Sequence, residues 1–140
     1  MLQVPLHYAR WYRPLEAEYL SRRLQQHFGY DLLLLGNSDL EQVKDSPVSN
    51  HYALREQERL SFEGVVAHFD ALPFAPDSLD VIVLAHALDH CEEPRVVLEE
   101  AYKALRHDGT LIVTGFNRWR ALSQALWRYE ARQYLSLIHI

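Results

Sequence analysis

The sequence predicts a doubly wound α/β fold built on a mostly parallel sheet, and three features predict it. Residues 30–35 and 80–85 are short, mainly apolar runs, as in strands buried on both faces of a sheet. A segment with helical spacing of apolar residues separates the second run from a third one at residues 110–114. Strands that alternate with helices pair in parallel through right-handed crossovers.

Composition limits the function classes. The chain has 140 residues, enough for one domain, and its net charge of −5 gives no strong nucleic-acid signal. Its one cysteine, Cys91, excludes an internal disulfide and a zinc site built on paired cysteines. No apolar run approaches the roughly 20 residues that span a bilayer, and no signal peptide is visible. We therefore expect a cytoplasmic protein without a membrane partner.

The first predicted element is a helix after Pro14, because proline suits a first helical turn. Leu20, Leu24 and Phe28 recur at every fourth position, and Gly29 would end the helix. The apolar run at residues 30–35 then predicts a buried strand that ends at Gly36.

The middle of the chain predicts weaker elements. Residues 37–47 are polar and have room only for a short helix. Weaker strands are predicted at residues 49–55 and 64–69, followed by a loop with two prolines.

The clearest strand is at residues 80–85, and Pro94 begins a helix that continues to about Leu105. Asp108 and Gly109 predict a turn before the strand at residues 110–114. A last helix is predicted at residues 119–134. In doubly wound sheets ligands bind beyond the carboxyl ends of the strands, so the loops that begin at Gly36, Asp70, Ala85 and Gly115 are the candidate site.

A family resemblance rests on an ordered set of motifs between Phe69 and Gly115. The stretches Phe69-Asp70-Ala71-Leu72-Pro73-Phe74 and Asp77-Ser78-Leu79-Asp80-Val81-Ile82 come first, and Leu105-Arg106-His107-Asp108-Gly109-Thr110-Leu111 follows. This order resembles the type 11 family of class I S-adenosylmethionine-dependent methyltransferases. Leu35-Gly36-Asn37, Leu84-Ala85-His86-Ala87-Leu88 and Thr114-Gly115-Phe116-Asn117 are similar to a subgroup of bacterial methyltransferase-like proteins. The resemblance implies a Rossmann-like fold and S-adenosylmethionine as cofactor.

The first loop departs from the family pattern of one acidic residue and three glycines. Only Gly36 remains, and Leu34 replaces the acid. Glycine lets the backbone approach a ligand closely, and Asn37 tolerates left-handed geometry better than most residues. The resemblance implies that Gly36 and Asn37 bind the cofactor.

The resemblance implies further cofactor contacts at the next strand ends. Glu56 is the candidate to accept hydrogen bonds from the ribose diol, and a solvated surface glutamate is the alternative. Asp70, with Ala71 and Leu72 beside it, is the candidate for the adenine contact, although His68 has the more regular spacing. His86 would line the pocket near the methionine end, or would simply hydrogen-bond its own loop.

Other chemistries have weaker support. His86 and His90 flank Asp89, but no third metal ligand is clear apart from Asp89 or Cys91, so we predict no metal. Cys91 beside His90 lacks an oxyanion hole and is not expected to be a nucleophile. Asn117 would face the substrate or cap the last helix.

The predicted function is S-adenosylmethionine-dependent methyl transfer to an unknown acceptor, which leaves the catalytic residues and oligomeric state open. The alternative is a non-catalytic methyltransferase-like interaction domain that has lost its cofactor. A dinucleotide-binding enzyme is a third possibility, but the required glycine spacing is missing.

The domain prediction is a partial methyltransferase domain at residues 1–134, with a helical lead-in at 1–29 and an α/β core at 30–134. Residues 135–140 resemble an in-frame translation of a sequencing-library adapter, and a natural apolar tail is the alternative. With the C-terminal strands of the family missing, the strand at residues 110–114 would be an exposed edge prone to aggregation.

Overall fold

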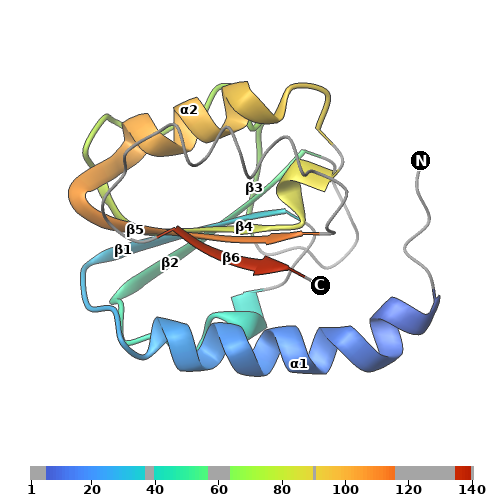
Figure 1. Ribbon diagram of the computed structural model, residues 1–140. Coiled ribbons are helices and arrows are strands. Elements are labelled where there is room, and N and C mark those ends of the chain that lie inside the picture. The colour runs from blue at the N-terminus through green and yellow to red at the C-terminus, as the bar shows by residue number, and fades with distance from the viewer. Residues whose placement is uncertain (1–5, 37–39, 57–63, 90, 116–134, 140) are drawn as a thin grey trace.

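A six-stranded parallel sheet forms the centre of the molecule, with helices on both faces (Figure 1). The computed structural model describes residues 6–36, 40–56, 64–89, 91–115 and 135–139. The strand order is β3-β2-β1-β4-β5-β6, and every neighbouring pair is parallel. The predicted doubly wound α/β fold is therefore confirmed. The strands are β1 (Asp31–Gly36), β2 (Asn50–Arg55), β3 (Val65–Val66), β4 (Leu79–Ala85), β5 (Leu105–Gly115) and β6 (Leu135–His139).

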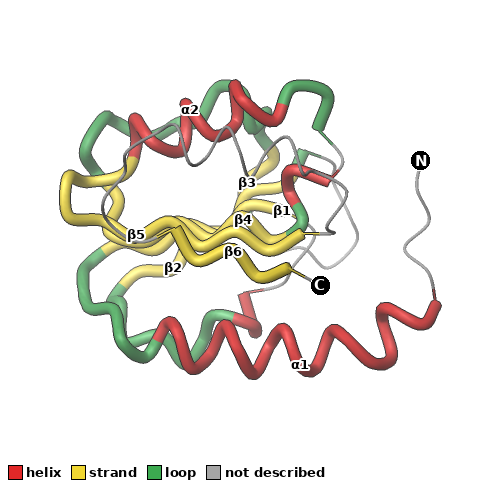
Figure 2. Tube along the Cα trace, viewed as in Figure 1, coloured by secondary structure: helices red, strands yellow, loops and turns green. Residues whose placement is uncertain are grey.

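The helices lie in two layers, one on each side of the sheet, as the trace in Figure 2 shows. The helix α2 (Pro94–Ala104) covers one face, and the helix α1 (Leu6–Leu24) lies along the other, together with the short helix η1 (Leu40–Gln42). A second short helix, η2 (Ala87–Asp89), follows β4. The helices η1, between β1 and β2, and α2, between β4 and β5, thus lie on opposite faces, as in a doubly wound sheet.

The central strand β1 explains the continuous apolar run in the sequence. Leu33 and Leu35 pack in the core beneath α2, whereas Leu32 and Leu34 pack in the core against α1. All four leucines are buried. Because alternate side chains enter opposite cores, a strand between two helical layers must be apolar at every position.

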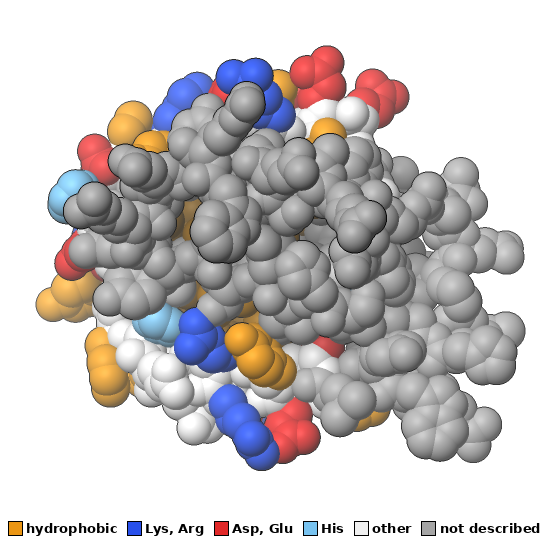
Figure 3. Space-filling model, viewed as in Figure 1, with side chains coloured by type: hydrophobic (Ala, Val, Ile, Leu, Met, Phe, Trp, Pro, Cys, Tyr) orange, Lys and Arg blue, Asp and Glu red, His pale blue; other side chains and the backbone are white. Residues whose placement is uncertain are grey.

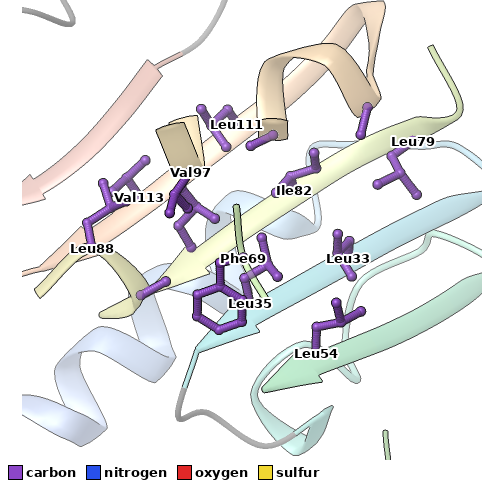
Figure 4. Packing of buried hydrophobic residues seen from close by; sticks show 14 residues of the cluster. Leu33, Leu35, Leu54, Phe69, Leu79, Ile82, Leu88, Val97, Leu111 and Val113 are labelled. Atoms are coloured by element: carbon purple, nitrogen blue, oxygen red, sulfur yellow. The ribbon is translucent and has the colours of Figure 1, made fainter. Parts of the chain in front are cut away.

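The core on the α2 side is the larger of the two (Figure 4). Val97, Ala101 and Ala104 of α2 pack on strand residues of β1, β4 and β5. Phe69, from the loop after β3, packs against Leu35 in the same core. These contacts confirm the helix predicted from Pro94, with Val97 and Ala101 facing the core, whereas Tyr102 is 61% exposed.

The helix α1 differs from its prediction at both ends. It begins at Leu6 rather than after Pro14, which lies inside it with its side chain exposed. A proline removes one helical hydrogen bond, a cost that the rest of a long packed helix can offset. Leu20 and Leu24 are buried as predicted, but Phe28 is 79% exposed because the helix ends before it.

The shorter predicted elements agree with the structure in part. Strands β2, β4 and the short helix η1 lie where the sequence predicts them, while β3 is only two residues long. The predicted turn at Asp108-Gly109 is wrong, because β5 begins at Leu105, directly after α2. The extra residues are taken up by a register shift, in which Leu79 pairs with Leu105 but Val81 pairs with Thr110. The helix predicted at residues 119–134 lies outside the described residues.

The expected exposed edge at β5 is also wrong. Residues 135–139 form β6, which pairs in parallel with β5 from Leu111↔Leu135 to Gly115↔His139. The backbone groups on that side of β5 are therefore paired, and the sheet ends at β6 instead. A short apolar run is compatible with a strand whatever its origin, and the adapter interpretation of residues 135–140 stays a prediction.

Charged side chains of both signs gather over α2, at the top of the view in Figure 3. Arg95 pairs with Glu99 and Lys103 pairs with Glu100, at distances of 2.9 and 2.7 Å. Such exposed pairs contribute little stability, so this face is a solvated one. Neither helix in the described part of the chain combines the length and the apolar character needed to cross a bilayer.

We predict that Asp80→Ala lowers the free energy of unfolding by about 3 kcal/mol, because it removes a partly buried charged acceptor. The Asp80 carboxylate accepts hydrogen bonds from the backbone N–H groups of Tyr30 and Asp31 at 2.7 and 3.0 Å, and from Arg106 at 3.1 Å. Urea unfolding followed by circular dichroism measures the change. Asp108→Ala, at an exposed position, is the control. An equal effect of both substitutions would contradict this account.

Candidate functional site

The candidate site is the carboxyl edge of the sheet, where β1 and β4 lie side by side. From β1 the chain continues to β2 on one side, while β4 occupies the other side. This is the point at which the strand order reverses, and open α/β sheets bind ligands there. Gly36 ends β1 and pairs with Ala85, the last residue of β4.

Gly36 is the one glycine that remains from the predicted cofactor loop, and the structure explains its presence. It is buried and has a φ of +123°, a conformation that other residues rarely adopt. A side chain at this position would overlap the carbonyl oxygen of Ala85, and its Cβ would lie 3.5 Å from the backbone nitrogen of Ala87. The end of β1 therefore rests against the loop that follows β4. Asn37 lies outside the described residues.

His86 begins that loop and holds an unusual backbone conformation, with a φ of +54°. Its Nδ1 lies 2.7 Å from Asp89 Oδ2, and its Nε2 lies 3.0 Å from Glu16 Oε2 on α1. The three side chains are 13%, 7% and 5% exposed, respectively. Each ring nitrogen thus faces a largely buried carboxylate.

This pairing sets the charge of His86. Burial alone would lower the pKa of the imidazole, but the hydrogen bonds with Asp89 and Glu16 outweigh it and raise the pKa to about 9. His86 is therefore an imidazolium at neutral pH, and both ring N–H groups donate. In this state it cannot accept a proton as a general base.

The loop after β4 is also fixed on its other side, next to β5. The His86 backbone N–H donates to the Thr114 carbonyl at 3.0 Å, and the Asp89 N–H donates to the His86 carbonyl at 3.3 Å. A Cβ at Gly115 would lie 3.1 Å from Asp89 Oδ1, so the small residue gives the carboxylate its space. Residues 86–89 thus sit between the glycines that end β1 and β5.

Glu56 lies directly after β2 with its side chain exposed, in the position predicted for a ribose-binding acid. Its Oε1 accepts a hydrogen bond from the Phe69 backbone N–H at 3.2 Å. The carboxylate therefore anchors the loop after β3 and remains open to solvent, which leaves it able to accept a further hydrogen bond. Its role toward a cofactor stays a prediction.

The loop after β3 carries the remaining predicted contacts. Asp70 and Ala71 are exposed, and Leu72 is half-buried against the core beneath α2. His68, the alternative to Asp70, is exposed too, and its carbonyl accepts the Ala71 N–H at 3.3 Å. Asp70 and His68 thus lie in the same tight turn, and both side chains are exposed, so burial does not favour either as the adenine contact.

No group of three histidine, cysteine or acidic side chains among the described residues is arranged to hold a metal ion. His90, which the sequence analysis considered as a metal ligand together with His86, lies outside the described residues, as do Phe116 and Asn117. The predicted substrate-facing role of Asn117 therefore stays a prediction.

The Cys91 thiol should react slowly with Ellman's reagent at pH 8. Burial, the main influence, raises its pKa to about 11, and the thiol contacts the Leu88 carbonyl at 3.5 Å. Because the thiolate is the nucleophile, we expect the native rate to be at least about 100-fold below the rate in urea. The chain has no other cysteine, so the unfolded protein is its own control. Equal rates would contradict the buried position.

Sequence reasoning identified His86 but missed its partner Glu16. The missed signal is the position of this carboxylate on the helix. Glu16, Leu20 and Leu24 recur at every fourth residue, so the glutamate lies on the stripe that faces the core. An acidic residue on a buried stripe is rare unless it is paired, and here the pair is with His86.

Comparisons with known proteins show the family and the fold of this chain. The model of the methyltransferase domain family matches residues 17–113. The uncharacterized protein YafS from Escherichia coli (strain K12) is 33% identical over 116 residues, which are 80% of this chain and 46% of YafS. The chain thus spans about half the length of this relative.

Two solved structures share the fold. One is a proposed S-adenosyl-L-methionine-dependent methyltransferase from Methanococcus maripaludis, with a TM-score of 0.58 and 17% identity. The match covers 85% of this chain and 62% of the chain from Methanococcus maripaludis. The other, with a TM-score of 0.57 and 21% identity, belongs to a Haloferax volcanii complex between the Trm112 methyltransferase activator and a proposed methyltransferase. This match covers 68% of the present chain and 48% of the matched chain.

Proposed function

Because this chain belongs to the methyltransferase domain family, we propose that it binds S-adenosylmethionine and transfers its methyl group to an acceptor. The observation that carries the proposal is the junction of β1 and β4. There Gly36 rests against the loop of His86 at the point where the strand order reverses. An exposed carboxylate, Glu56, follows the neighbouring strand.

The residues at this edge fit such a cofactor. Gly36 lets the end of β1 pack directly against the backbone of Ala85, which brings the ends of β1 and β4 together at the proposed site. Glu56 is held by the Phe69 N–H but is open to solvent, as an acceptor for a ribose diol must be. Asp70, also exposed, would be the acceptor for an adenine amino group. Two exposed carboxylates, one directly after β2 and one in the loop after β3, thus support the proposed cofactor contacts.

The chemistry of transfer places few demands on the protein. The bound cofactor would supply an electrophilic methyl group on a positively charged sulfur. Gly36, Glu56 and Asp70 would bind and orient the donor, and orientation of donor and acceptor supplies much of the rate in such reactions. His86 is already protonated, so it would not take a proton from the acceptor.

One observation favours a second function, a methyltransferase-like domain that mediates interactions without a cofactor. Leu34 stands where the family pattern has an acidic residue, and its side chain is buried in the core against α1. That position therefore offers no polar contact to a ligand. The same experiment separates the two functions.

The test is calorimetric titration of S-adenosylhomocysteine into the purified chain. Binding should weaken about tenfold or more in Glu56→Gln, because a carboxylate accepts both diol hydrogen bonds better than an amide. Glu99→Gln, which removes an equal charge from an exposed pair on α2, should bind as the unsubstituted chain does. No binding to the folded chain would refute the cofactor and favour the interaction domain.

A further inference from the structure

The helix α1 reaches the candidate site although it belongs to a distant part of the sequence. Leu20 and Leu24 of α1 pack against the face of the sheet opposite to α2. The strand residues in that core include Val83, Ala85 and Ile112. Figure 1 shows that α1 runs against the strand direction, so its earlier residues lie nearer the carboxyl edge. Glu16, one turn before Leu20, contacts His86 there, across 70 residues of sequence.

The contact adds to the hydrogen bonds that hold this loop. His86 has a left-handed backbone, which is uncommon for a residue other than glycine. Asp89 contacts the imidazole from within the same loop, whereas Glu16 is the partner from outside it. The α1 carboxylate thus ties the loop to the body of the protein.

We propose that Glu16 is a positioning residue for the cofactor site: through His86, the docked helix α1 holds residues 86–89 in the conformation that meets the cofactor. This inference rests on the proposed function. It follows from the contacts of the loop, which lies against Gly36 on the side of β1 and against Gly115 on the side of β5. Displacement of the loop would therefore alter the surface at which the cofactor is proposed to bind.

Two substitutions and one matched control test the role of Glu16. Glu16→Ala removes the contact, and Glu16→Gln keeps an acceptor for His86 but removes the charge. Glu18→Gln is the control, because Glu18 lies on the same helix in an exposed pair with Arg22. Thermal unfolding comes first, and if Glu16→Ala does not fold, Glu16→Gln carries the test.

Amide hydrogen exchange by nuclear magnetic resonance provides a readout that does not depend on the cofactor. We expect the N–H groups of His86 and Asp89 to exchange at least tenfold faster in the Glu16 variants. The N–H groups of β2, which lies farther along the sheet, should keep their rates. Faster exchange throughout the sheet, or no change at His86 and Asp89, would overturn the positioning role.

Titration with S-adenosylhomocysteine provides the second readout. We expect affinity to fall at least tenfold in Glu16→Ala, less in Glu16→Gln, and not at all in Glu18→Gln. If the unsubstituted chain binds and the Glu16 variants bind equally well, the inference is overturned and the proposed function stands. If the unsubstituted chain does not bind, the proposed function itself fails, and the role in cofactor positioning fails with it.

Discussion

Gly36→Ala is expected to lower the free energy of unfolding by about 3 kcal/mol or more. The residue has a φ of +123°, and the added Cβ would overlap the Ala85 carbonyl oxygen. That oxygen belongs to the backbone of a central strand and cannot move aside as a side chain can. The substitution therefore combines backbone strain with overpacking, each of which costs about 1–3 kcal/mol.

Urea unfolding of Gly36→Ala and Gly115→Ala measures this difference between the two strand ends. At Gly115 the new Cβ would lie 3.1 Å from the Asp89 side chain, which can shift, and no positive φ is required. We expect a loss of about 1 kcal/mol there, because only modest overpacking is involved. A Gly36→Ala protein as stable as Gly115→Ala would mean that β1 and β4 can separate at their ends without cost.

The sequence was sufficient to predict the centre of the fold for a physical reason. Strands β1 and β4 are buried on both faces over most of their length, so apolar residues follow one another there and the pattern is nearly continuous. The edges of the sheet lack this constraint. Val65 and Val66 of β3 are exposed, and a two-residue strand leaves little pattern to detect. Each residue of β6 pairs with a residue of β5 that lies 24 positions earlier, as Leu135 does with Leu111. A local sequence pattern does not reveal such a distant pairing.

The candidate site could be predicted only as far as local motifs reach. Gly36 and His86 were found because each follows a clear strand, and a strand end in this fold is a place for function. The charge of His86 could not be predicted, because Glu16, one of the carboxylates that contact it, comes from α1, far away in the sequence. Glu16 lies within the helix predicted after Pro14, but no local pattern links it to a residue 70 positions later in the sequence. Contacts between polar residues that are distant in the sequence could thus not be predicted.

His86→Asn is expected to remove about 2 kcal/mol of stability at pH 6 and almost none above pH 9. Asparagine tolerates the left-handed backbone of His86, so the substitution removes the charge and ring contacts with little added strain. The pKa of His86 is raised from 6.5 to about 9, because its hydrogen bonds with Asp89 and Glu16 outweigh its burial. Such a rise corresponds to at most about 3 kcal/mol, and solvent screening at this partly exposed ring reduces it to about 2 kcal/mol.

The sign of the pH dependence follows from the direction of that change. A group whose pKa is higher in the folded protein stabilises it fully below the unfolded pKa, here near 6.5, and loses this effect as the pH rises to about 9. The difference in unfolding free energy between the unsubstituted chain and His86→Asn should therefore shrink steadily across this window in urea titrations. His107→Asn, at an exposed position, should show no such trend. A difference that stays constant with pH would mean that His86 is neutral in the fold, and the link between α1 and the loop would then be a simple hydrogen bond rather than a charged one.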